Sequence, residues 1–119
     1  MARSPITTHV LDTQRGRPAA GVGVLLEGLA QEAREAAWHE MARGTTNGDG
    51  RCEDLLTPGS RLAPGTYRLS FATGAYFAAA KQTTFYPLVS VVFEIADPEQ
   101  HYHVPLLLAA HGYSTYRGS

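Results

Sequence analysis

The chain lacks the features that mark secreted and membrane proteins. Its single cysteine, Cys52, excludes a disulfide within the chain. Small secreted domains usually carry several cysteines, so we expect a reducing, cytoplasmic compartment. The longest apolar run, residues 104–110, is far shorter than the roughly 20 residues that a membrane helix needs. The first residues also show no apolar stretch of the kind found in a secretory signal.

An excess of one charge is missing as well. The chain has 10 basic and 11 acidic residues, which gives a formal net charge of −1. Surfaces that bind nucleic acid or anionic lipid depend on an excess of Lys and Arg. We therefore expect neither nucleic acid nor a membrane among the partners. The 119 residues suffice for one domain with its own core, residues 1–119.

Short alternating segments dominate the pattern that remains. Apolar residues recur at every second position in segments 6–11, 66–72, 89–95 and 104–108. The 12 glycines and 7 prolines favour many turns over long helices. Strands of this length separated by turns predict an all-β fold, an antiparallel β-sandwich. One short helix is expected over residues 73–81, with Thr73 as its cap.

Three local features have alternatives. Residues 29–43 show helical spacing and helix-forming composition, but a polar loop at 30–35 followed by a strand from Trp38 to Thr45 fits as well. Pro105 has no N–H to donate, which predicts an edge strand or a bulge there, and a bulge is also expected near Gly23 or Gly28. The aromatic residues expected in the core are Trp38, Tyr67, Phe71 and Phe93.

No motif indicates chemistry by spacing alone, since the P-loop, paired CxxC, GxSxG and HExxH patterns are all absent. His9 and His103 are candidate acid–base groups, because imidazole exchanges protons near neutral pH. Arg51 offers forked donors for a planar carbonyl, urea or carboxylate group. Taken alone, a histidine in such a position is more often structural, and an arginine at a turn exit is usually a solvated loop residue.

Two further functional interpretations, a metal site and a nucleophilic thiol, are considered and not favoured. His101 and His103 point to the same side of a strand, which can begin a metal site, but no third ligand lies nearby in sequence. Two surface histidines beside a turn are favoured, and no metal is predicted. A buried, inert thiol is likewise favoured for Cys52 over a nucleophile.

Short segments spread along the chain together resemble the 5-hydroxyisourate hydrolases, which are the transthyretin-related proteins. The resemblance runs in order through nearly the whole sequence. It is specific through the terminal tetrapeptide together with His9, Arg51 and His103, since any one motif alone would be weak. The segments are HVLDT at 9–13, GRPA at 16–19, NGDGR at 47–51, FYP at 85–87, HYHVPLL at 101–107 and YRGS at 116–119.

The resemblance implies a transthyretin-like sandwich of two four-stranded sheets with one short helix. It favours the loop-and-strand alternative for residues 29–43. It also implies a homotetramer, a dimer of dimers, with sites in a channel between the dimers. The residues that match the lining of this channel are His9, Arg51, His103, Tyr116 and Ser119.

The implied reaction converts 5-hydroxyisourate to 2-oxo-4-hydroxy-4-carboxy-5-ureidoimidazoline, a step of urate catabolism, and needs no cofactor. One imidazole, of His9 or His103, takes a proton from the attacking water, and the sequence leaves open which one. Arg51 stabilises the oxyanion, while Tyr116 and Ser119 hold the heterocycle. The implied catalytic residues are thus His9, Arg51, His103 and Ser119. The alternative is a transthyretin-like carrier of small molecules without catalysis, and a β-sandwich interaction module is a third possibility.

Overall fold

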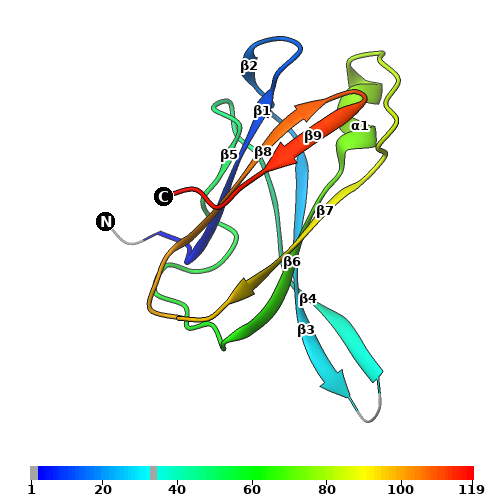
Figure 1. The fold of residues 1–119 in the computed structure, drawn as a ribbon. Coiled ribbons are helices and arrows are strands. Elements are labelled where there is room, and N and C mark those ends of the chain that lie inside the picture. Colours follow the sequence, from blue (N-terminus) through cyan, green and yellow to red (C-terminus); the bar gives the residue numbers. More distant parts are fainter. Residues whose placement is uncertain (1–2, 33–34) are drawn as a thin grey trace.

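A computed structural model, which describes residues 3–32 and 35–119, shows two β-sheets and one short helix (Figure 1). The predicted β-sandwich is confirmed. In chain order the elements are β1 (Ile6–Asp12), β2 (Arg17–Pro18), β3 (Gly23–Glu32), β4 (Glu35–Thr45), β5 (Arg51–Cys52), β6 (Gly65–Phe71), α1 (Thr73–Ala79), β7 (Val89–Ile95), β8 (Tyr102–Ala109) and β9 (Gly112–Thr115).

The two sheets differ in how they are built. The second sheet has the predicted four strands, in the order β4-β3-β6-β7. The first has the order β2-β1-β8-β9, and β5 makes it five-stranded by also pairing with β1. The expected fourth strand is thus split into β2 and β5, two residues each, which pair with different parts of β1. The expectation of a wholly antiparallel sandwich is wrong at one place, because β1 and β8 run parallel.

Alternation along the strands builds the core. In β1, Ile6 and Val10 are fully buried between the sheets, whereas Thr7, His9 and Leu11 lie on the outward face. Each large apolar side chain buried in this way stabilises the fold by about 1.5–3 kcal/mol. The largest fully buried side chains are Phe71, Phe77, Ile6, Leu26, Leu69, Ile95, Leu106 and Leu108.

Residues 29–43 form strands in their described part. The expected loop at 30–35 is wrong as far as Glu32, where β3 ends, and residues 33–34 lie outside the described residues. The expected strand from Trp38 is confirmed, although β4 already begins at Glu35. The ladder between β3 and β4 runs from the pair Gly23–Thr45 to the pair Glu32–Glu35, and this backbone pairing outweighs helical propensity. Figure 1 shows this ribbon extending away from the rest of the sandwich.

The side chains of this ribbon also differ from expectation. Trp38 is not in the core, because it is partly exposed and the guanidinium of Arg68 stacks over its ring at 4.2 Å. The predicted bulge lies next to Gly28, where the pairing between β3 and β4 shifts between Leu26 and Glu27. Arg68 also bonds to Glu27 at 2.8 Å across the same outward face.

The helix and Pro105 require two corrections. Thr73 does not cap α1, since Ala72 is the N-cap residue and the Thr73 hydroxyl donates instead to the carbonyl of Tyr86 at 2.6 Å. Pro105 lies neither in an edge strand nor at a bulge, because β8 runs between β1 and β9. It is tolerated because pairing with β9 stops at Leu106, next to it. In the described ranges no helix is long and apolar enough to cross a membrane.

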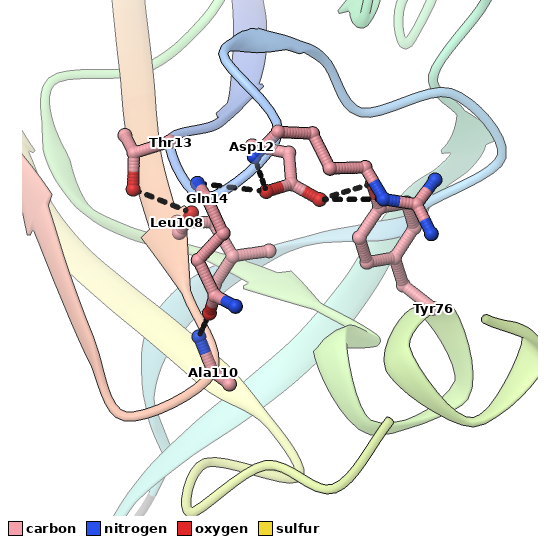
Figure 2. A network of polar contacts seen from close by, with 7 residues as sticks. Asp12, Thr13, Gln14, Tyr76, Leu108 and Ala110 are labelled. Atoms are coloured by element: carbon pink, nitrogen blue, oxygen red, sulfur yellow. Dashed lines mark hydrogen bonds and ion pairs between the residues drawn. The ribbon is translucent and has the colours of Figure 1, made fainter. Parts of the chain in front are cut away.

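A polar cluster around Asp12 ties the end of β1 to the helix and to the β8–β9 turn (Figure 2). The Asp12 carboxylate is 1% exposed and accepts bonds from the backbone N–H groups of Gln14 and Arg15 at 3.0 and 3.1 Å. Tyr76 on α1 donates its hydroxyl to the same carboxylate at 2.7 Å. Burial, and then the bond to Asp12, raises the pKa of Tyr76 to about 12.

We predict that Tyr76→Phe lowers the free energy of unfolding by about 1–2 kcal/mol, because a buried carboxylate loses a hydrogen bond. Urea denaturation at neutral pH measures the loss, and Tyr113→Phe on exposed β9 is the matched control. The folded pKa of Tyr76 lies above its ordinary value of 10, so this stabilisation is present below pH 10 and is lost as the pH rises toward 12. The difference between wild type and variant should therefore shrink over that range, and a constant difference would contradict the assignment.

Candidate functional site

The parallel pairing of β1 with β8 brings the two predicted imidazoles to one sheet face. Thr7 pairs with His103 and His9 pairs with Pro105, so His9 and His103 are diagonal neighbours on the outward face. Strand β5 pairs with the other edge of β1 and sets Arg51 directly opposite His9. Partners opposite each other in a ladder point to the same face. The structure therefore places His9, Arg51 and His103 side by side within one chain.

The turn before Arg51 fixes its position. The Asn47 side chain accepts bonds from the backbone N–H groups of Asp49 and Arg51 at 2.9 and 3.0 Å. Gly50 has φ 74° and bonds through its carbonyl to the N–H of Val10 at 2.7 Å. A side chain at Gly50 would collide with the Val10 carbonyl. The turn is thus pressed against β1, and Arg51 leaves it in register with His9.

His103 is held from both sides. On one side the hydroxyl of Thr7, which is buried, lies 2.8 Å from His103 Nδ1. On the other side the imidazole lies against Gly118, where an added Cβ would stand 2.6 Å from Cδ2. Burial, and then the nearby positive charge of Arg51, lowers the pKa of His103. The neutral imidazole is therefore favoured at neutral pH.

The C-terminal tail runs back along β8. The Gly118 N–H donates to the His103 carbonyl at 2.9 Å, and the two residues form an isolated antiparallel bridge in the same register as β9. Arg117 stacks over Tyr102 at 4.5 Å and bonds to Gln100 at 2.7 Å. The bridge brings the tail to His103, and Figure 1 shows the tail continuing from β9 past β8 to the C-terminus.

The remaining predicted tail residues are more open. Tyr116 is 58% exposed and lines a hollow of about 130 Å³ together with His103 and Tyr102. Ser119 is exposed at the end of the tail, one residue beyond the bridge to His103. The structure thus brings the tail backbone to His103 without enclosing these two side chains.

The surroundings of Cys52 and His101 bear on the two other interpretations, a nucleophilic thiol at Cys52 and a metal site at His101. Cys52 is buried on the core side of β5, and burial, followed by the charge of Asp54, raises the pKa of its thiol to about 11. A thiol with that pKa is a poor nucleophile at neutral pH. His101 bonds to Thr7 and Arg3 at 3.0 and 3.2 Å. Throughout the described part of the chain no group of three or more potential metal ligands occurs.

Sequence reasoning paired His101 with His103 but missed Thr7 and Gly118 as neighbours of His103. The signal for Thr7 was present, because alternation places it on the same side of β1 as His9. Nothing in the sequence indicates that β8 is the strand that pairs with β1. A larger hollow, of about 730 Å³, lies on the outward face of the second sheet and is lined by Glu27, Arg43 and Arg68, with no predicted site residue.

The fold and the site together define a transthyretin-like β-sandwich with acid–base groups on one outward sheet face. The sequence matches the HIUase/Transthyretin family over residues 6–118. The chain belongs to this family. A mouse protein named 5-hydroxyisourate hydrolase is 52% identical over 116 residues, which cover 98% of this chain and 96% of that protein.

Two solved structures show the likeness of the fold. The structure of Klebsiella pneumoniae 5-hydroxyisourate hydrolase aligns with a TM-score of 0.79 and 37% identity, and covers 96% of this chain and 98% of that one. Sea bream transthyretin in complex with thyroxine aligns with a TM-score of 0.85 and 31% identity, and covers 97% of this chain and 95% of that one. The transthyretin-like fold is confirmed.

We predict that Gly118→Ala separates the tail from His103, because the added methyl group cannot fit beside the imidazole. The His103 ring resonances should shift in NMR spectra, while the free energy of unfolding changes by less than about 1 kcal/mol, since fraying ends contribute little to stability. Gly112→Ala is the matched control, because nothing lies within 4 Å of its added Cβ. Unchanged His103 resonances in Gly118→Ala would show that the tail does not rest on the ring.

Proposed function

We propose that this chain hydrolyses 5-hydroxyisourate with His9, Arg51 and His103, and that Tyr116 and Ser119 of the tail hold the substrate. The observation that carries the proposal is the meeting of two imidazoles and a guanidinium on one sheet face. It occurs in a chain whose relatives are named 5-hydroxyisourate hydrolases along nearly their full length. Hydrolysis of this compound is a step of urate catabolism.

The three side chains supply what ring opening needs. Water adds to a ring carbonyl, and a neutral imidazole takes the proton that the water loses. Arg51 donates two parallel hydrogen bonds toward the carbonyl, where negative charge develops. The C–N bond then breaks, the nitrogen takes up a proton, and the carbonyl carbon becomes a carboxylate. Burial, and then the charge of Arg51, lowers the pKa of His103, so its imidazole is neutral at neutral pH.

The charge of the site distinguishes this function from that of a carrier. Sea bream transthyretin has been solved with thyroxine, so the same fold binds small molecules. In the present chain the face formed by Arg51, His9 and His103 is polar and basic. A polar heterocycle with several carbonyl groups suits such a face better than a largely apolar ligand. Catalysis is therefore favoured over transport.

The outward face is incomplete as a site in one chain. His9, Arg51 and His103 are only partly buried, so a substrate bound to them would remain open to water on one side. We infer that a second copy covers this face in a homotetramer, a dimer of dimers, as the family resemblance implies. Leu11 and Leu107 lie beside one another on the same outward face and offer it an apolar contact. A cytoplasmic location belongs to the same proposal, because Cys52 is a free thiol.

We predict that the protein accelerates the ultraviolet decay of 5-hydroxyisourate generated from urate by urate oxidase. His103→Ala and His9→Ala should each lower kcat/KM by about 10²–10⁴-fold through loss of proton transfer or orientation. Arg51→Ala should cost about 10²–10³-fold through loss of oxyanion stabilisation. Deletion of residues 118–119 should also lower kcat/KM.

The matched control is His111→Ala, which removes an exposed imidazole outside the site. Full activity in His103→Ala would remove that residue from the mechanism. A protein without any effect on the decay would overturn the hydrolase assignment. Loss of activity on addition of a chelator would revive the metal interpretation of His101 and His103.

We predict that light scattering after size exclusion gives four times the mass of the chain. Leu107→Glu should lower both the mass and kcat/KM, because a charge on the outward face of the first sheet opposes its burial by another copy. Leu29→Glu places the same charge on the β3–β4 ribbon and serves as the control. A fully active monomer would show that the site is complete in one chain.

A further inference from the structure

A chain of hydrogen-bonded polar side chains lies on the same outward face as the proposed site and ends at His103. The buried Thr7 hydroxyl lies between two nearly parallel imidazoles, 3.0 Å from His101 Nε2 and 2.8 Å from His103 Nδ1. His101 Nδ1 in turn lies 3.2 Å from Arg3 Nη2. The chain therefore runs from Arg3 through His101 and Thr7 to His103.

The direction of these hydrogen bonds is set at the Arg3 end. A guanidinium group has donors only, so His101 Nδ1 must accept. A neutral His101 then carries its proton on Nε2 and donates a hydrogen bond from there to the Thr7 hydroxyl. The pKa of His101 is lowered by burial and then by the charge of Arg3, which favours this neutral form. The first link therefore leaves Thr7 as an acceptor from His101.

The Thr7 hydroxyl has one proton and can donate one hydrogen bond. Thr7 is 1% exposed, and a buried hydroxyl proton needs an acceptor. Within the described ranges, the hydrogen bonds of the Thr7 hydroxyl run only to the two imidazoles, and His101 is already a donor. The proton therefore points to His103 Nδ1. A neutral His103 that accepts at Nδ1 carries its own proton on Nε2.

We propose that Thr7 is a positioning residue that holds His103 in the tautomer with the proton on Nε2, so that His103 serves the reaction as a donor. This inference rests on the proposed function and resolves the choice that the sequence leaves open. The attacking water passes its proton to His9, and His9 returns it to the ring nitrogen that leaves. His103 keeps its Nε2 proton throughout and donates a hydrogen bond to the developing oxyanion beside Arg51.

The tautomer is measured directly by NMR on the intact protein with isotope-labelled histidine ring nitrogens at neutral pH. We expect the His103 spectrum to show a protonated Nε2 and an unprotonated Nδ1. Thr7→Val removes the hydroxyl at nearly constant volume and should leave His103 with a mixture of both tautomers. A wild-type spectrum with the proton on Nδ1 would overturn the inference, whether or not the variant folds.

Kinetics test the consequence of the tautomer. Thr7→Val should lower kcat by about 10- to 100-fold with little change in KM, the range seen when the partner that orients a histidine ligand is removed. Thr7→Ser keeps a hydroxyl and should restore most of the activity and the wild-type tautomer. Equal kcat values for Thr7→Val and wild type would contradict the positioning role.

Thr8→Val is the matched control for these variants. Thr8 is the next residue of β1, is equally buried, and donates its hydroxyl to the Val104 carbonyl on the core side. We expect it to affect stability and to leave the His103 tautomer unchanged. If the wild-type protein fails to hydrolyse 5-hydroxyisourate, the proposed function fails while the tautomer measurement still stands. An active enzyme with the proton on Nδ1 refutes the tautomer assignment alone.

Discussion

The parallel register of β1 against β8 is the constraint on which the site depends. It sets Thr7 opposite His103 and His9 opposite Pro105, and alternation sends all four side chains outward. A shift of one residue would turn the site groups of one strand into the core and its apolar residues toward solvent. Burial of Ile6, Val10 and Leu106 therefore fixes the position of the imidazoles as firmly as it fixes the fold.

The prediction from sequence succeeded where a physical pattern is local. Alternation of apolar residues identified the main strands, including those at residues 6–11 and 66–72. The prediction failed where contacts between residues far apart in the sequence determine the position of a side chain. Thr73 bonds to Tyr86 instead of capping α1, and Trp38 stacks on Arg68 outside the core, and neither partner can be read from nearby sequence. The meeting of His9, Arg51 and His103 came from the family resemblance, since strand pairing between the two ends of the chain leaves no local signal.

Pro105 in β8 and Gly118 in the tail together explain how the tail reaches the site. Pro105 cannot donate a backbone hydrogen bond, and the regular pairing of β8 with β9 stops next to it. The tail then resumes the same register at Gly118, the residue without a side chain, beside the His103 ring. The interruption leaves Tyr116 exposed beside His103, and Arg117 anchors the tail on Tyr102.

The surroundings of His103 give the two imidazoles different roles, a hydrogen-bond donor at His103 and a proton acceptor at His9. His103 accepts a bond at Nδ1 from a buried hydroxyl whose polarity is set from Arg3, and it lies among positive groups that oppose its protonation. An imidazole in that setting is poorly suited to gain a proton and well suited to donate one hydrogen bond in a fixed direction. His9 lies opposite Arg51 and is partly exposed, so a water molecule bound with the substrate can reach it. The same sheet face therefore supplies a rigid donor and a separate proton acceptor, which is the asymmetry that hydrolysis of a ring amide requires.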